Sequence, residues 1–119
     1  MKVSIITAVC NGADVIGTTL DSVAVQSHGD IEHVVVDGAS TDATVAVVRE
    51  RGRRVAKVLS EPDRGVYDAF NKGLALATGD VVAFLNAGDS YLDAGVVASV
   101  AEVFAAEDVD AVFGDVLIV

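Results

Sequence analysis

The chain has 119 residues, with 18 acidic against 8 basic side chains and a formal net charge of −10. This length suits one domain, and 52% hydrophobic residues exclude a disordered chain. The acidic balance argues against nucleic acid and anionic membrane surfaces as partners, because both are bound mainly through lysine and arginine.

No stretch of the sequence approaches the roughly 20 apolar residues of a membrane span. The apolar run Val3–Cys10 contains Ser4 and Thr7 and stops at Asn11, which argues against a secretory signal. Cys10 is the single cysteine, so neither an internal disulfide nor a zinc site is predicted. We therefore expect a cytoplasmic protein, or one attached peripherally to the inner face of the cell membrane.

Short runs rich in β-branched residues alternate with longer helical patterns. Strands are predicted at Val3–Val9, Ile31–Val36, Val55–Leu59 and Val81–Leu85, and helices at Asp14–Val25, Ala43–Arg51, Val66–Ala77 and Asp93–Ala106. A fifth strand is predicted over Ala111–Val119. This alternation predicts an α/β fold of Rossmann-like type, a mostly parallel sheet with helices on both faces.

Ligands of open α/β sheets bind beyond the carboxyl ends of the strands. Four segments meet that edge here: Thr7–Gly12, Asp37–Asp42, Ser60–Asp68 and Asn86–Ser90. Four aspartates lie in or beside them, namely Asp37, Asp63, Asp68 and Asp89. Structural alternatives remain open: Asp37 or Asp42 could cap the next helix, Asp63 could serve the turn after Pro62, and Asp68 could complement the helix dipole.

Two common nucleotide motifs are absent. Gly12 and Gly17 have the spacing of a phosphate-binding loop, but Thr18 stands where that motif needs lysine. No GxGxxG follows the first strand, so a nicotinamide or flavin dinucleotide is not predicted.

Ordered motifs along nearly the whole chain carry a family resemblance. They are Val3–Gly12, Thr19–Val23 with Gln26, Val35–Asp42, Ser60–Gly73, Ala77–Asp80 and Phe84–Asp89. Together they resemble a family 2 inverting glycosyltransferase of the GT-A fold. The resemblance implies that residues 1–119 form a single nucleotide-sugar-binding domain, the donor-binding half of the GT-A fold, incomplete at its C-terminus.

The resemblance also implies a nucleotide-diphosphate sugar donor and the residues that bind it. Thr7 and Ala8 would line the base, and Asp37 would accept a hydrogen bond from the pyrimidine N3–H, a role that suits an acceptor-only carboxylate. Arg64 and Asp68 would flank the diphosphate and the sugar, although Arg64 could also be a solvated loop cation. The remaining donor-binding positions are Asn11, Asn86, Ala87 and Gly88.

Asp89 corresponds to the family's metal-binding carboxylate, which holds Mn2+ or Mg2+ on the diphosphate. An acidic cleft would repel a pyrophosphate unless a hard divalent cation bridged the two, and that cation would neutralise charge on the leaving diphosphate. The chain departs from many relatives at Cys10, Gly38 and Gly88, where Tyr, Asp and Asp are common. With one carboxylate, most metal ligands would come from phosphate oxygens and water, so we expect weak metal affinity without the donor.

An inverting transfer needs a general base to take the proton of the acceptor hydroxyl. In relatives this residue lies beyond the position of Val119, so no catalytic residue is assigned within this chain. We expect a glycosyltransferase acting on a cell-envelope glycan or glycolipid acceptor.

Two other functions remain open. A catalytically silent nucleotide-binding module would lack the base and the acceptor site, and it could form a homo-oligomer through a sheet edge at Val112–Val119. Nucleotidyl transfer in sugar-nucleotide synthesis is a third possibility, but no Gly-rich basic phosphate loop lies near the first strand.

Overall fold

The computed structural model describes residues 1–111. Its strands are β1 (Val3–Val9), β2 (Ile31–Asp37), β3 (Val55–Ser60) and β4 (Val81–Phe84), and its helices are α1 (Ile16–Ala24), α2 (Thr44–Arg51), α3 (Val66–Leu76) and α4 (Val96–Ala106). The four strands form one parallel sheet in the order β3-β2-β1-β4. The predicted Rossmann-like α/β fold is therefore confirmed.

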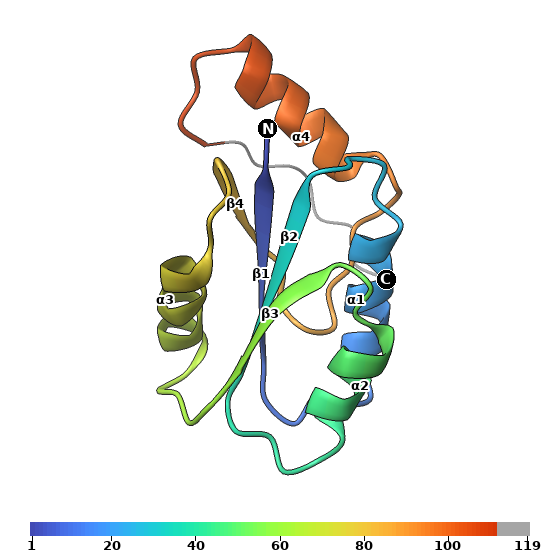
Figure 1. Cartoon of the computed structure of the whole chain (residues 1–119), viewed down its shortest axis with the longest axis vertical. Coiled ribbons are helices and arrows are strands. Elements are labelled where there is room, and N and C mark those ends of the chain that lie inside the picture. The colour runs from blue at the N-terminus through green and yellow to red at the C-terminus, as the bar shows by residue number, and fades with distance from the viewer. Residues whose placement is uncertain (112–119) are drawn as a thin grey trace.

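Helices cover both faces of the sheet, with α3 on one side and α1 and α2 on the other (Figure 1). The side chains of β1 alternate accordingly. Ile5 packs in a cluster with Val23 of α1, whereas Ile6 packs with Ala69 of α3. Because both faces are covered, β1 and β2 are buried at nearly every position, as expected for the central strands of a parallel sheet.

The predicted element order is correct, and the differences lie at the ends of elements. The last helix begins at Val96 and not at Asp93, because the Asp93 carboxylate accepts the Gly95 N–H at 2.8 Å in a turn that precedes the helix. The predicted fifth strand, Ala111–Val119, lies outside the described residues except for its first position. No helix in residues 1–111 is both long enough and apolar enough to span a membrane.

Two glycines allow close contacts between elements. Gly17 of α1 lies under the guanidinium of Arg51, which pairs with Asp21 and so joins α1 to α2. Gly73 of α3 lies against the buried side chain of Ile6 in β1. A Cβ at either position would overlap its neighbour, but the arginine is partly exposed and can swing away.

The Gly73→Ala variant should therefore lose about 1–3 kcal/mol of unfolding free energy, because Ile6 cannot move without disturbing the core. Gly17→Ala should change stability much less, since alanine favours the helix by up to about 1 kcal/mol over glycine. Urea unfolding of the two variants measures the difference. Equal losses would contradict the packing described for Gly73.

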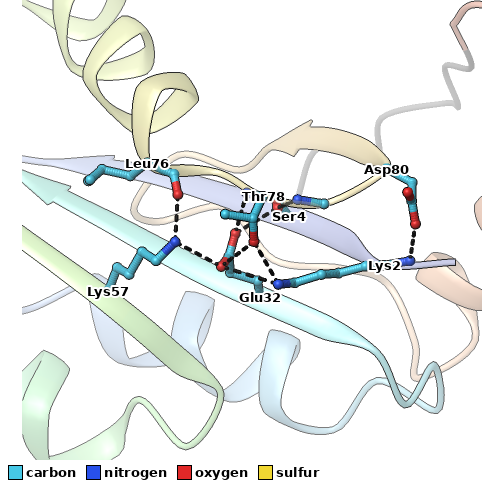
Figure 2. A network of polar contacts seen from close by, with 8 residues as sticks. Lys2, Ser4, Glu32, Lys57, Leu76, Thr78 and Asp80 are labelled. Atoms are coloured by element: carbon cyan, nitrogen blue, oxygen red, sulfur yellow. Dashed lines mark hydrogen bonds and ion pairs between the residues drawn. The ribbon is translucent and has the colours of Figure 1, made fainter.

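A buried polar network joins the strands at their amino ends, opposite the carboxyl edge of the sheet (Figure 2). The Glu32 carboxylate accepts hydrogen bonds from the Ser4 hydroxyl at 2.9 Å and from the Thr78 N–H at 2.9 Å, and it lies 3.1 Å from Lys57 Nζ and 3.6 Å from Lys2 Nζ. Burial raises the pKa of Glu32, but the hydrogen bonds from Thr78, Ser4 and Lys57 outweigh it and lower the pKa to about 2. The network therefore holds an ionised carboxylate that ties β1, β2 and β3 to the segment after α3.

Candidate active site

The loops that follow β1, β2 and β3 gather at one end of the sheet, which is the carboxyl edge (Figure 1). In the order β3-β2-β1-β4, the chain runs outward from β1 to β3 and then returns to the other side of β1. The direction of winding thus reverses between β1 and β4, and this is where open α/β sheets bind ligands. A cleft of about 190 Å³ lies there, lined by Ala8, Val9, Cys10, Asp63, Gly65, Val66, Ala69 and Asn86.

Asn11 joins the loop after β1 to the loop after β2. Its backbone has a φ of 50°, a conformation that asparagine tolerates better than most residues. Its side-chain oxygen accepts the Thr41 N–H at 2.8 Å, and its own N–H donates to the Ser40 hydroxyl at 2.7 Å. In the structure Asn11 therefore shapes the edge of the sheet, and any contact with a donor would be additional to these bonds.

Asp37 is the last residue of β2 and is completely buried. Its carboxylate accepts hydrogen bonds from the Ser60 hydroxyl at 2.7 Å, from the Ser40 N–H at 3.0 Å and from the Ser40 hydroxyl. Asp37 thus ties the ends of β2 and β3 together. A contact between this carboxylate and a base would require these serines to rearrange.

Thr7 does not reach the cleft. The residue is 0% exposed, and its hydroxyl is hydrogen-bonded to Nε2 of the buried His33 at 2.8 Å. The neighbouring Ala8 points to the opposite side of β1 and lines the cleft. Of the two residues predicted to contact the base, the structure brings only Ala8 to the surface of the site.

The loop between β3 and α3 is organised by Asp68 and Lys72. The Asp68 carboxylate accepts the Arg64 N–H at 2.9 Å, and Lys72 Nζ donates to the Pro62 carbonyl at 2.8 Å and lies 3.1 Å from a Glu61 carboxylate oxygen. The bond from the Arg64 N–H lowers the pKa of Asp68, and the nearby Lys72 lowers it further, against a smaller effect of desolvation. Sequence reasoning found no role for Lys72; the structure shows that it secures this loop.

Arg64 is exposed, and its guanidinium makes no hydrogen bond or ion pair within the described part of the chain. It lies between Asp63 and Gly65, which both line the cleft. The side chain is therefore available to an anion at the cleft. The Asp68 carboxylate, by contrast, is bonded to the Arg64 N–H within the loop, and Asp68 does not line the cleft.

Asp63 is a site residue for which the sequence favoured a structural role in a turn. Its carboxylate accepts the Gly65 N–H at 3.0 Å, which is that turn, but the residue also lines the cleft. A Cβ at Gly38 would lie 2.9 Å from Asp63 Oδ2, so the absence of a side chain at position 38 makes room for this carboxylate. The sequence placed Asp63 among the aspartates at the carboxyl edge but left its role open between the turn and the site.

The segment Asn86–Asp89 forms a tight turn. The Asp89 N–H donates to the Asn86 carbonyl at 3.0 Å, and Gly88 has a φ of 95°. A positive φ at the third residue is the geometry of a type II turn, which requires glycine. Gly88 thus serves the backbone of the turn. Ala87 anchors it to β1 through a bond of 3.3 Å from its N–H to the Ala8 carbonyl.

Asp89 is exposed, and its carboxylate accepts no hydrogen bond and forms no ion pair within residues 1–111. No group of three or more His, Cys, Asp or Glu side chains that could hold a metal occurs in the described residues. A single carboxylate oxygen donor fits Mg2+ or Mn2+ only when other oxygens complete the shell, because these ions prefer near-octahedral oxygen coordination. The Asp89 carboxylate therefore fits a cation that a phosphate group also coordinates.

An all-parallel sheet with its cleft at the point of reversal is the architecture of a nucleotide-binding α/β domain. The model of the family described as "Glycosyl transferase family 2" matches residues 4–119. The chain belongs to this family.

A curated relative from Mycobacterium bovis, named PGL/p-HBAD biosynthesis glycosyltransferase, is 43% identical over 119 residues, which is 96% of this chain and 46% of the relative. The chain thus spans about half the length of the curated relatives it matches. Two solved structures share the fold. S. aureus TarS in complex with UDP-GlcNAc has a TM-score of 0.81 at 28% identity, covering 89% of this chain and 32% of that one.

The second solved structure is the Pyrobaculum calidifontis mannosyltransferase in complex with GDP-Man and Mn2+. It has a TM-score of 0.72 at 32% identity, over 78% of this chain and 29% of that one. Both the fold and the family predicted from the sequence are therefore confirmed.

Proposed function

We propose that the cleft between β1 and β4 binds the nucleotide-diphosphate part of a sugar donor. The observation that carries this proposal is the cleft at the carboxyl edge, because two loops that contribute to its lining also carry Arg64, between Asp63 and Gly65, and Asp89, three residues after Asn86. Neither side chain has a hydrogen-bond or ion-pair partner within residues 1–111. Ala8 and Cys10 would contact the nucleoside, and Arg64 would face the diphosphate. Asn86, Ala87 and Gly88 would place the metal-binding turn beside it.

Asp89 would hold Mn2+ or Mg2+ together with the diphosphate, and the cation would supply charge neutralisation on the leaving group. Two of the structural relatives support this, because one is described with UDP-GlcNAc and the other with GDP-Man and Mn2+. The chain has a net charge of −10, and a pyrophosphate brought to its carboxylates needs a compensating cation.

For the whole protein we propose metal-assisted, inverting sugar transfer to a cell-envelope glycan or glycolipid. The acceptor class is supported by the mycobacterial relative, whose name refers to PGL/p-HBAD biosynthesis. Neither the general base nor an acceptor pocket is assigned within residues 1–111. The alternative is a nucleotide-binding module that does not transfer sugar by itself, favoured by the 46% share of the relative's length that the chain spans.

Calorimetric titration of the 119-residue chain with UDP, GDP and dTDP, in EDTA and in Mn2+, tests the donor site. At least one nucleotide should bind at least tenfold more tightly with Mn2+, a gain of about 1.4 kcal/mol. An assay of donor hydrolysis and transfer then separates the two functions, since binding without turnover favours the silent module. If a folded sample binds none of the three nucleotides, the proposal of a donor site is wrong.

A further inference from the structure

Helix α1 has a polar stripe that holds the connection between β4 and α4. Thr19, Ser22 and Gln26 are spaced by three and four residues, so they lie on one face of the helix and its C-terminal end. All three bond to that connection. The Ser22 hydroxyl accepts the Tyr91 N–H at 3.2 Å, and the Gln26 side chain donates to the Asp93 carbonyl at 2.7 Å and accepts the Val97 N–H at 3.0 Å.

Thr19 is the member of this stripe that contacts the turn carrying Asp89. Its hydroxyl accepts the Gly88 N–H at 2.9 Å and donates to the Asp89 carbonyl at 2.7 Å. The hydroxyl thus holds the two ends of the Gly88–Asp89 segment, the Gly88 N–H and the Asp89 carbonyl. Thr19 is 0% exposed, so its rotamer is held by packing, whereas Gly88 and Asp89 are exposed.

This arrangement orients the Asp89 side chain indirectly. The Asp89 carboxylate has no hydrogen bond of its own in the described residues, so its direction is set by the backbone from which it projects. Three bonds define that backbone: the two to Thr19 and the one from the Asp89 N–H to the Asn86 carbonyl. Groups behind a metal ligand commonly control metal affinity by fixing the ligand's position.

We propose that Thr19 is a positioning residue which sets the affinity of the site for the divalent cation through its bonds to the Gly88 N–H and the Asp89 carbonyl. The proposal rests on the proposed function, because it assumes that Asp89 is the metal ligand. Thr19 would not contact the nucleotide. Its effect should appear in the metal-dependent part of nucleotide binding and be absent from the metal-free part.

The test compares Thr19→Val with the wild-type chain by calorimetry. Valine keeps the shape of threonine but removes both hydrogen bonds, the one from the Gly88 N–H and the one to the Asp89 carbonyl. At a fixed nucleotide concentration, the Mn2+ concentration needed for half-maximal enhancement should rise by about tenfold or more. Nucleotide affinity in EDTA should stay at the wild-type value, and Thr19→Ser, which keeps the hydroxyl, should restore the metal response.

Ser22→Ala is the matched control. It removes a hydroxyl from the same face of α1, and that hydroxyl bonds to the same connection at Tyr91, two residues beyond Asp89. It should lower stability but leave the Mn2+ response unchanged. An unchanged Mn2+ response in a folded Thr19→Val, or equal losses in both variants, would overturn the proposal. If Thr19→Val does not fold, Thr19→Ala, which removes the hydroxyl and puts no group in its place, is measured in the same way, and an unchanged Mn2+ response there overturns the proposal. Wild-type chain that binds no nucleotide would refute the donor site itself, which is a distinct result.

Discussion

Replacement of Asp89 with asparagine should abolish the effect of Mn2+ on nucleotide binding. The Asp89 carboxylate is exposed and unpaired within residues 1–111, and it is the one protein carboxylate we place on the cation. An amide of the same shape keeps the turn but loses the charge that attracts a divalent ion. In calorimetric titrations, the affinities measured in Mn2+ and in EDTA should become equal within error.

Asp14→Asn is the control for this experiment. Asp14 is also exposed, lies in the loop after β1 at the same edge of the sheet, and makes no side-chain hydrogen bond within residues 1–111. Its replacement removes the same unit of charge, so it measures the general electrostatic effect, which salt screens over about 10 Å. A full Mn2+ effect in Asp89→Asn, or an equal loss in Asp14→Asn, would remove Asp89 from the metal site.

The second large effect concerns the stability of the domain in mild acid. Burial lowers the pKa of His33 from 6.5 to about 4. The unfolded chain therefore binds the proton more tightly than the native protein, and stability falls as the pH drops from about 6.5 to about 4. By linkage, the loss between pH 7 and pH 5 should be about 2 kcal/mol in urea unfolding.

Two variants isolate the contribution of His33. His33→Gln keeps a partner for the Thr7 hydroxyl but does not titrate, so its stability should change little between pH 7 and pH 5. His28→Gln replaces the second histidine, which is only partly buried, and should retain the wild-type loss. A loss of the same size in His33→Gln would show that another group is responsible. Glu32 does not account for the loss between pH 7 and pH 5. Its pKa is lowered from 4.5 to about 2, so its contribution to stability is lost only as the pH falls from about 4.5 to about 2.

The carboxyl edge shows how far reasoning from sequence reaches. The positions of Ala8, Asn86 and Asp89 follow from the alternation of strands and helices, since parallel strands must end at one edge. Asp37, Asp68 and Asn11 also lie at that edge, yet their polar atoms are already bonded to Ser40, Arg64 and Thr41. Which side of a loop a side chain faces depends on contacts between loops far apart in the sequence, and no local pattern encodes these contacts.

The same reason explains why the sequence left the role of Asp63 open and gave none to Thr19 or Gln26. Asp63 reaches the cleft because Gly38, 25 positions earlier in the chain, leaves space for its carboxylate. Thr19 and Gln26 belonged to motifs that identified the family, but their partners after β4 lie 67 to 71 residues away in the sequence and come into contact with them only in the folded chain.

The sequence by itself determined the order of the elements, the parallel sheet, the family and the acidic balance of the chain. Those properties can be read from local periodicity and from the order of the motifs, without knowing which residues are in contact. The tertiary structure decided that the cleft lies between β1 and β4 and that Thr7 and Asp37 are buried. It also decided that Asp89, which has no side-chain partner within residues 1–111, projects from a turn held by Thr19. These depend on packing between distant segments, because burial and hydrogen-bond partners are fixed only when the layers come together.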